Sequence, residues 1–515
     1  MTRRLSVLYP FLAAAYPVLA LAAANRGEGI RPAELVMPLA VSLAVAGALL
    51  LLARLITPDP HRRAILAFLG VIVFASHGYV RELLLSIPPL GFLAHDAVTL
   101  PLAGLLLGAT AMSARAPGRS YAAVSRYLTV VMAILVGGSA VTFARGAPPP
   151  RVARPPHSSP PGAGDGTGTR PHFFLIVLDK YTGSASLASN YRFDNAGFER
   201  FLEEHGFRVL RGPRANYVQT FLALASLLNW EYADGLVDSL GGDEQRRELL
   251  YPMVEDNRTA QALAALGYRF VFVPSAFAIT MENRFADERV QHPRDVPREF
   301  ETVWLRTTLL HRAVERWCAT ARCFRGLLPQ VHESAESFDW KFARLGELAR
   351  STEPLFVFAH LALPHEPYLF AADCSHTKPY WPERDDGPEA EQVKAAYVAQ
   401  VQCVNRKLER LVQELDRTGG RPAIVVLQSD HGHGRLGRDL PALEDVTADR
   451  IAERVDIFAA YHLPGAPAGL IPDSMGPVNA MRAIMRHYYG FDLPPLEEST
   501  WWSSRDQPYK LTRIP

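Results

Sequence analysis

The sequence lacks an excess of charge of either sign. Its 515 residues include 54 lysines and arginines against 53 aspartates and glutamates, which leaves a formal net charge of +1. This balance gives no general electrostatic reason to expect binding to nucleic acid. The chain is long enough for more than one domain. Its first part consists of hydrophobic runs broken by short polar loops, and the rest is typical of a globular domain.

Cysteine is also scarce, and the hydrophobic first part contains none. The four cysteines are Cys318, Cys323, Cys374 and Cys403. Their number is even, so two disulfides can form if this part of the chain is exported. Cys318–Cys323 and Cys374–Cys403 are the simplest pairing. Sequence alone does not fix the connectivity, and four buried thiols are the alternative.

Long hydrophobic runs are plentiful in the first part of the chain. Five of them, at 6–24, 35–56, 64–80, 87–112 and 124–143, approach the ~20 residues that cross a bilayer. Basic residues are concentrated in alternate loops, at Arg3, Arg4, Arg62, Arg63, Arg115 and Arg119. The positive-inside rule places those loops in the cytoplasm. We therefore expect a multi-pass protein of a bacterial inner (plasma) membrane, with its C-terminal part in the periplasm or outside the cell.

A segment rich in proline, glycine and serine follows the last hydrophobic run. Residues 147–171 read APPPRVARPPHSSPPGAGDGTGTRP, a composition typical of a semi-extended tether. The predicted organisation is a transmembrane region at 1–146, a linker at 147–171 and an extracytoplasmic domain at 172–515.

Strand-length apolar runs recur through the C-terminal part. They are FFLIVL at 173–178, RFVFV at 269–273, LFVFA at 355–359 and AIVVL at 423–427. Runs that are apolar on both faces suit strands buried between helices. A helical stripe over 391–416 lies between two of them. This alternation predicts an α/β sandwich around a mainly parallel sheet, preceded by an all-α transmembrane region of about five helices.

Acidic and imidazole side chains follow three of these runs. Asp179 follows the first, His360 and His365 follow the third, and Asp430, His431 and His433 follow the fourth. Ligands bind beyond the carboxyl ends of strands in such sheets, and these side chains bind divalent metals. Each residue alone is weak evidence, because an Asp after a strand is often a turn residue. Together they predict a metal site.

Thr220 opens an apolar run with helical spacing, in NYVQTFLALASLLN. A threonine there can be an ordinary helix cap. The same position also lies near unpaired backbone N–H groups that attract anions. A nearby cation can activate its hydroxyl as a nucleophile. The two interpretations are compatible.

These segments, in this order, resemble the sulfatase / alkaline phosphatase superfamily over most of residues 171–490. They are most similar to membrane-anchored bacterial sulfatase-like proteins related to lipoteichoic acid synthases and phosphoethanolamine transferases. The resemblance implies an alkaline-phosphatase-like fold with one divalent metal ion. It implies Asp179, Thr220, Asp430 and His431 as metal ligands, and Thr220 as nucleophile. It implies that His365 contacts the substrate or assists the leaving group, with further substrate contacts from His433 and Asn216.

The chain departs from soluble sulfatases in two ways. Lys180 follows Asp179, where many of them have a second acidic residue. The Thr220 segment also lacks the C-x-P-x-R setting in which their nucleophile is converted to formylglycine. CATAR, from Cys318 to Arg322, is a near match, but it lies far downstream of the expected place.

The leading functional hypothesis is transfer or hydrolysis of phosphate esters of envelope lipids or glycans. A sulfuric ester hydrolase is the second hypothesis, and a non-catalytic envelope binding protein that retains the fold is the third. Mixed Asp, His and Thr ligands favour zinc or manganese over calcium or magnesium. The membrane is an expected partner and nucleic acid is not; the sequence gives no oligomeric state.

Overall fold

The computed structural model describes residues 7–25, 30, 32–86, 98–99, 101, 104, 108, 121–145, 170–242, 244–292, 299–311, 333–382, 389–417, 421–436 and 440–514. The chain divides into two compact units. The first comprises residues 1–148 and 298–331, and the second comprises residues 149–297 and 332–515. The domain boundaries expected from the sequence stay a prediction.

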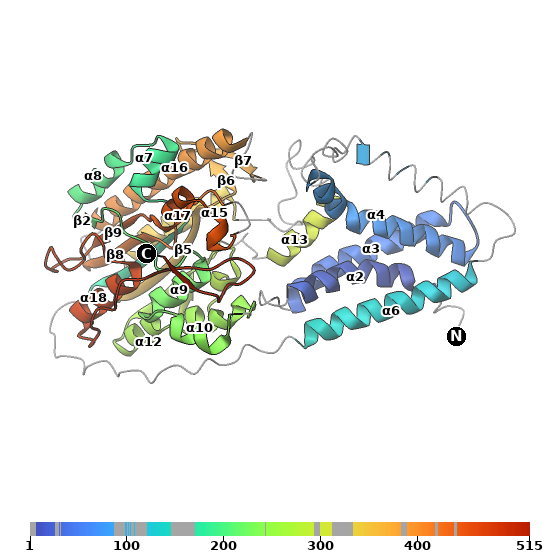
Figure 1. Ribbon diagram of the computed structural model, residues 1–515, viewed down its shortest axis with the longest axis horizontal. Coiled ribbons are helices and arrows are strands. Elements are labelled where there is room, and N and C mark those ends of the chain that lie inside the picture. The colour runs from blue at the N-terminus through green and yellow to red at the C-terminus, as the bar shows by residue number, and fades with distance from the viewer. Residues whose placement is uncertain are drawn as a thin grey trace. The chain divides into compact units, whose positions relative to one another are not determined.

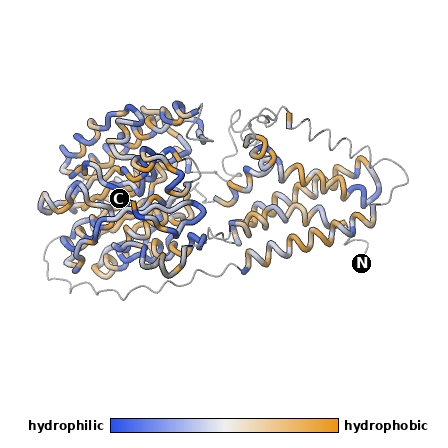
Figure 2. Tube along the Cα trace, in the orientation of Figure 1, coloured by the Kyte–Doolittle hydropathy of each residue, from blue (hydrophilic) through white to orange (hydrophobic). Residues whose placement is uncertain are grey.

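The first unit is built from apolar helices (Figure 1). They are α2 (Tyr9–Ala24), η2 (Pro32–Leu35), α3 (Val36–Ala53), α4 (Pro60–Ser86) and α6 (Ala122–Ala144). Three spans are long and apolar enough to cross a membrane, namely Pro32–Ala53, Pro60–Arg81 and Ala122–Ala144, and α2 is a shorter apolar helix. Figure 2 shows these helices in hydrophobic colours along most of their length. The expected span at 87–112 lies almost wholly outside the described residues.

One helix from the C-terminal part of the sequence belongs to this first unit. Helix α13 (Glu299–Thr307) contacts α2, η2, α3 and α4. After it, the Leu309 N–H donates to the Phe74 carbonyl at 2.8 Å. A Cβ atom at Gly78 would lie 2.1 Å from the Arg306 carbonyl oxygen, so this close approach requires glycine. The apolar cluster beneath α13 contains Val18, Ala22, Leu35, Phe300, Trp304 and Leu305.

The second unit is organised by a seven-stranded sheet with the order β2-β9-β8-β1-β5-β3-β4. Its strands are β1 (His172–Asp179), β2 (Phe207–Val209), β3 (Arg269–Val273), β4 (Glu288–Arg289), β5 (Leu355–Pro364), β8 (Ala423–Ser429) and β9 (Ala459–His462). The pairs from β8 to β4 are parallel, and β9 pairs antiparallel with β8 and β2. The predicted mainly parallel sheet is confirmed, and the four predicted apolar runs form β1, β3, β5 and β8.

Helices cover both faces of this sheet (Figure 1). On one face lie α7 (Ser184–Tyr191), α8 (Ala196–Glu204), α15 (Ala335–Leu348) and α16 (Ala390–Arg417). On the other lie α9 (Thr220–Asn229), α10 (Asp234–Leu240), α11 (Tyr251–Glu255), α12 (Arg258–Ala265) and α18 (Pro477–Tyr489). All eight residues of β1 are buried, because both of its faces pack against helices. The α/β sandwich expected from the sequence is therefore confirmed.

Smaller elements complete the second unit. They are η4 (Arg247–Leu250), η5 (Ala278–Thr280), η7 (Leu443–Asp445), α17 (Ala448–Val455) and the hairpins β6 (Tyr368–Phe370)–β7 (His376–Tyr380) and β10 (Thr500–Trp502)–β11 (Thr512–Ile514). A disulfide joins Cys374 to Cys403 on α16. Cys318 and Cys323, the other predicted pair, lie outside the described residues.

Candidate active site

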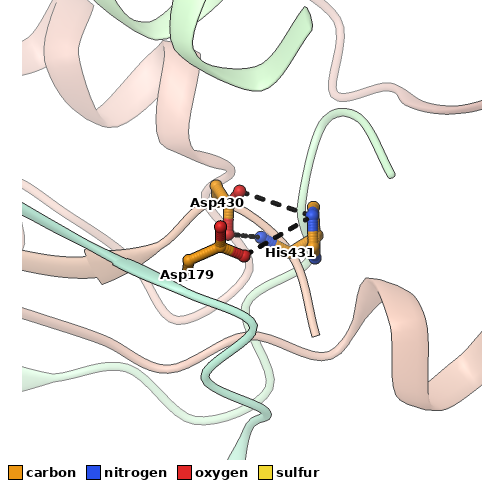
Figure 3. Close-up of side chains that lie close together, drawn as sticks. All are labelled: Asp179, Asp430 and His431. Atoms are coloured by element: carbon orange, nitrogen blue, oxygen red, sulfur yellow. Dashed lines mark hydrogen bonds and ion pairs between the residues drawn. The ribbon is translucent and has the colours of Figure 1, made fainter. Parts of the chain in front are cut away.

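Three metal-type side chains meet at the carboxyl ends of β1 and β8. Asp179 is the last residue of β1, and Asp430 and His431 follow β8 directly. One potential ligand atom from each lies within 4.8 Å of the others (Figure 3). The His431 Nε2 atom lies 3.4 Å from Asp430 Oδ2 and 4.0 Å from Asp179 Oδ1. All three side chains are buried, so the sheet edge holds a compact, enclosed set of ligand atoms.

Backbone geometry fixes the two segments that carry these side chains. Lys180 adopts a left-handed conformation, φ 62°, which turns the chain directly after Asp179. Its N–H donates to Asp430 Oδ1 at 3.3 Å, and the His431 N–H donates to the same oxygen at 2.8 Å. A Cβ atom at Gly432 would lie 2.0 Å from the Glu453 carbonyl oxygen, so glycine is required where the chain passes α17.

The carboxylates of Asp179 and Asp430 form a closely spaced, buried acidic pair. Within the described part of the chain, both Asp179 oxygens and Asp430 Oδ2 are buried without a hydrogen-bond partner. Burial and the neighbouring Asp430 raise the pKa of Asp179 well above its ordinary value. Burial likewise raises the pKa of Asp430. Buried, unpaired carboxylates are costly, so the donor set fits a bound cation.

His431 presents a lone pair to this acidic pair. Its Nδ1 atom lies 3.0 Å from the Gly432 carbonyl, which can only accept a hydrogen bond, so Nδ1 carries the proton and Nε2 does not. Burial, with Arg454 close by, lowers the pKa of His431 well below its ordinary value, which keeps the ring neutral. A neutral imidazole with its second nitrogen bonded to a carbonyl is the usual form of a metal-ligating histidine.

Thr220 lies at the start of α9, and its Oγ1 atom is 3.2 Å from His431 Nε2. The interpretation of Thr220 as the helix cap is wrong, because the capping position belongs to Gln219 and Thr220 is the first helical residue. Its hydroxyl therefore lies beside the unpaired N–H groups of the first turn. Most of the rest of α9 is buried on the sheet, which holds this hydroxyl in place.

His365 follows β5, and its N–H donates to the Asp179 carbonyl oxygen at 3.1 Å. Its Nδ1 atom bonds to the Glu366 carbonyl at 2.5 Å, which leaves Nε2 as an acceptor. Burial lowers the pKa of His365 to about 4, so the ring is neutral at pH 7. Beside it, Lys180 Nζ lies 3.0 Å from both carboxylate oxygens of Glu366. The lysine at the position of a second acidic ligand thus forms a buried ion pair.

The other two predicted substrate-binding residues make extensive contacts within the protein. His433 is buried, with Nδ1 at 2.9 Å from the Tyr191 hydroxyl and Nε2 at 3.3 Å from the Tyr368 hydroxyl. Asn216 is also buried, and its amide bonds to the Val478 N–H and the Ser499 carbonyl, both at 2.9 Å. These bonds give both residues a structural role, and their contact with substrate stays a prediction.

Arg454 is a site residue that sequence analysis missed. It lies on α17, and its guanidinium bonds to the Val218 carbonyl at 2.7 Å and lies 3.1 Å from His431 Nε2. It therefore links the segment before Thr220 to the metal-type cluster. No local sequence signal marks it, because its partners are brought to it only by the fold.

Part of the chain that carries these residues matches a known protein family. Residues 321–473 match the family model described as Sulfatase. Most of this match, residues 332–473, lies in the second unit. The matched segment includes His365, Asp430, His431 and His433, whereas Asp179 and Thr220 precede it. No match was found among curated proteins.

Similar solved structures share little sequence identity with this chain. The C-terminal periplasmic domain of EcEptC from Escherichia coli has a TM-score of 0.43 and 12% identity, covering 67% of this chain and 93% of that one. The same domain has been solved in complex with Zn. The soluble domain of lipooligosaccharide phosphoethanolamine transferase A from Neisseria meningitidis has a TM-score of 0.41 and 11% identity, with coverage of 62% and 88%. Phosphonate monoester hydrolase SpPMH from Silicibacter pomeroyi has a TM-score of 0.41 and 14% identity, with coverage of 64% and 74%.

Proposed function

We propose that the chain is a membrane-bound, metal-dependent enzyme that transfers or hydrolyses phosphate esters of envelope lipids or glycans, with Thr220 as nucleophile. One observation carries the proposal: the Thr220 hydroxyl lies 3.2 Å from the neutral His431, beside the buried Asp179–Asp430 pair. The sulfatase-family match over residues 321–473 supports an ester-cleaving or ester-transferring reaction.

Asp179, Asp430, His431 and Thr220 would hold one divalent ion. When bound, the ion would supply the positive charge that offsets the two carboxylates, lowers the pKa of the Thr220 hydroxyl and balances charge on the ester oxygens. The borderline-soft ligand set, with an imidazole beside carboxylates, favours zinc or manganese.

Residues of the chain would carry out the bond-forming and proton-transfer steps of the proposed reaction. Thr220 Oγ1 would bond to phosphorus as the bond from phosphorus to the leaving oxygen breaks, and the hydroxyl proton would end on the leaving alcohol. The first-turn N–H groups of α9 would bind the ester oxygens. The oxygen of water or of a second alcohol would then bond to phosphorus as the bond from phosphorus to Thr220 Oγ1 breaks, and the proton of the attacking hydroxyl would end on Thr220 Oγ1. His365 would accept a proton at Nε2 in that step, because its Nδ1–H is bound to the Glu366 carbonyl.

A five-pass topology with the second unit outside the cytoplasm belongs to the same proposal. Arg62 near the start of α4 lies over the ring of Tyr121, directly before α6, at 5.8 Å. Helix α4 then runs for 27 residues to Ser86, about 40 Å. Ser86 and the start of α6 therefore lie at opposite ends of α4. This supports a further crossing by the expected span at 87–112, and arginine placement supports the orientation.

The test uses the full-length protein in detergent with zinc or manganese. Chromogenic phosphodiester, phosphomonoester and sulfate ester substrates are compared for wild type, Thr220→Val and Thr220→Ser. We expect phosphodiester turnover that falls at least about 10³-fold in Thr220→Val and is partly retained in Thr220→Ser, which keeps a hydroxyl. Intact-mass analysis of quenched enzyme should show one added phosphoryl group in wild type and none in Thr220→Val. Equal rates in all three proteins would refute a nucleophilic Thr220.

A sulfatase is the second candidate, favoured by the family that matches residues 321–473. Its weakness is chemical, since the Thr220 segment lacks the C-x-P-x-R setting in which a cysteine or serine becomes formylglycine. Sulfate ester turnover that depends on Thr220 would move the assignment to this function. Zinc binding without turnover of any ester would instead favour a binding protein that retains the fold.

A further inference from the structure

His360 is a fully buried histidine on β5, and the proposed mechanism assigns it no role. It pairs in register with Val177 of β1, two residues before Asp179. Side chains two residues apart along a strand share a face. His360 and Asp179 therefore project from the same face of the sheet, the face that α9 covers.

Two hydroxyl groups lie against Nδ1 of His360. The Phe277 N–H donates to Ser275 Oγ at 3.1 Å, and that hydroxyl lies 2.6 Å from Thr280 Oγ1. Thr280 Oγ1 in turn lies 2.8 Å from His360 Nδ1. The simplest pattern runs in one direction, with Ser275 donating to Thr280 and Thr280 donating to Nδ1. The proton of the neutral ring then lies on Nε2.

This Nε2 atom faces Asp179. It lies 3.8 Å from Asp179 Oδ2, while the other oxygen, Oδ1, faces His431 at 4.0 Å. Among the described residues, His360 Nε2 and both Asp179 oxygens are buried without a hydrogen-bond partner. Unpaired buried polar atoms are costly, and a small movement of either side chain would satisfy two of them together.

We propose that His360 is a positioning residue, whose Nε2–H donates to Asp179 Oδ2 and so holds Oδ1 toward the metal site. This inference rests on the metal site of the proposed function. His360 is not part of the cluster of ligand atoms that lie within 4.8 Å of one another. His360 would therefore act on the metal only through Asp179. In other proteins, groups that hydrogen-bond to a metal-ligating carboxylate orient it in the same way.

The test is the zinc affinity of full-length protein in detergent, measured without substrate by competition with a chromogenic chelator. Wild type is compared with His360→Leu, His360→Gln and Thr280→Val. We expect His360→Leu to bind zinc about 10–100-fold more weakly. Gln can place an amide N–H near the position of Nε2, so His360→Gln should recover part of the loss. Thr280→Val keeps the side-chain shape without the hydroxyl and should give an intermediate loss.

Thermal unfolding in chelator checks that each variant is folded. Equal zinc affinity in wild type and His360→Leu would overturn the inference. So would His360→Gln binding no better than His360→Leu, because packing and not the N–H would then explain the loss. If His360→Leu fails to fold, the zinc affinities of His360→Gln and Thr280→Val decide the question. Wild-type zinc affinity in both variants would overturn the inference, and a lower zinc affinity in Thr280→Val would support it. Wild type that binds no zinc would instead refute the metal site of the proposed function, and this inference with it.

Discussion

Replacing Asp430 by Asn should stabilise the metal-free protein, and bound metal should cancel most of this advantage over wild type. The oxygens of Asp179 and Asp430 that face each other lie within 4.8 Å. At an effective dielectric constant of about 20, two unit charges at that distance repel by about 3 kcal/mol. Burial raises the pKa of both carboxyls, and Asp430 raises that of Asp179 further, so at pH 8 the pair destabilises metal-free protein.

The amide introduced by Asp430→Asn would remove that repulsion and keep an acceptor oxygen for the Lys180 and His431 N–H groups. In chelator at pH 8, we therefore expect Asp430→Asn to raise the free energy of unfolding by up to about 3 kcal/mol. With zinc at 100 times its dissociation constant, wild type should gain about 2.7 kcal/mol and the variant far less.

The assay is urea unfolding of full-length protein in detergent, followed by tryptophan fluorescence. Trp230 and Trp502 are buried in the second unit and report on it. Asp416→Asn is the matched control, because Asp416 is half exposed, and it should behave as wild type in both conditions. An Asp430→Asn protein that is less stable than wild type in chelator would refute the charge-repulsion argument.

Three further changes test the fold around the site. Cys403→Ser opens a disulfide that spans 29 residues and should lower the free energy of unfolding by about 3–4 kcal/mol; reductant should lower wild type equally, and no change in urea midpoint would contradict this. Lys180→Met leaves Glu366 buried and unpaired and should lower the free energy of unfolding by about 3–5 kcal/mol. Adding Glu366→Leu to this variant should restore most of the lost stability. A double variant as unstable as Lys180→Met alone would refute the view that Lys180 and Glu366 form an isolated pair. Leu222→Ala, at 1% exposure on α9, should cost about 2–5 kcal/mol in the same unfolding assay, and a loss below about 1 kcal/mol would mean that α9 packs loosely.

The central strands could be predicted because the local sequence of each strand indicates that it is buried. β1, β3, β5 and β8 are apolar on both faces, and this pattern does not depend on partners far along the chain. Asp179, Asp430 and His431 could be predicted to meet for the same reason, since each lies at or directly after the carboxyl end of such a strand. The strands β2, β4 and β9 are two to four residues long, too short for a periodic signal.

What the sequence could not indicate depends on distant contacts. An amphipathic helix such as α13 looks the same whether it packs on a sheet or on membrane helices, so its place in the first unit could not be foreseen. Arg454 and His360 gain their roles from Val218, His431 and Asp179, which are more than 20 residues away in the chain. The sequence around a single arginine or histidine does not indicate a partner that is distant in the chain.

The position of α13 has a practical consequence for producing this protein. A shortened form that begins at His172 would keep Phe300, Trp304 and Leu305 but lose the helices that these side chains pack on. Water would then meet a contiguous apolar face, which promotes aggregation and retention in detergent. Polar replacements at these three positions should make the shortened protein soluble, yet the same replacements should weaken the intact one. A fragment engineered for crystallisation and a chain working in its membrane therefore need opposite residues on one helix.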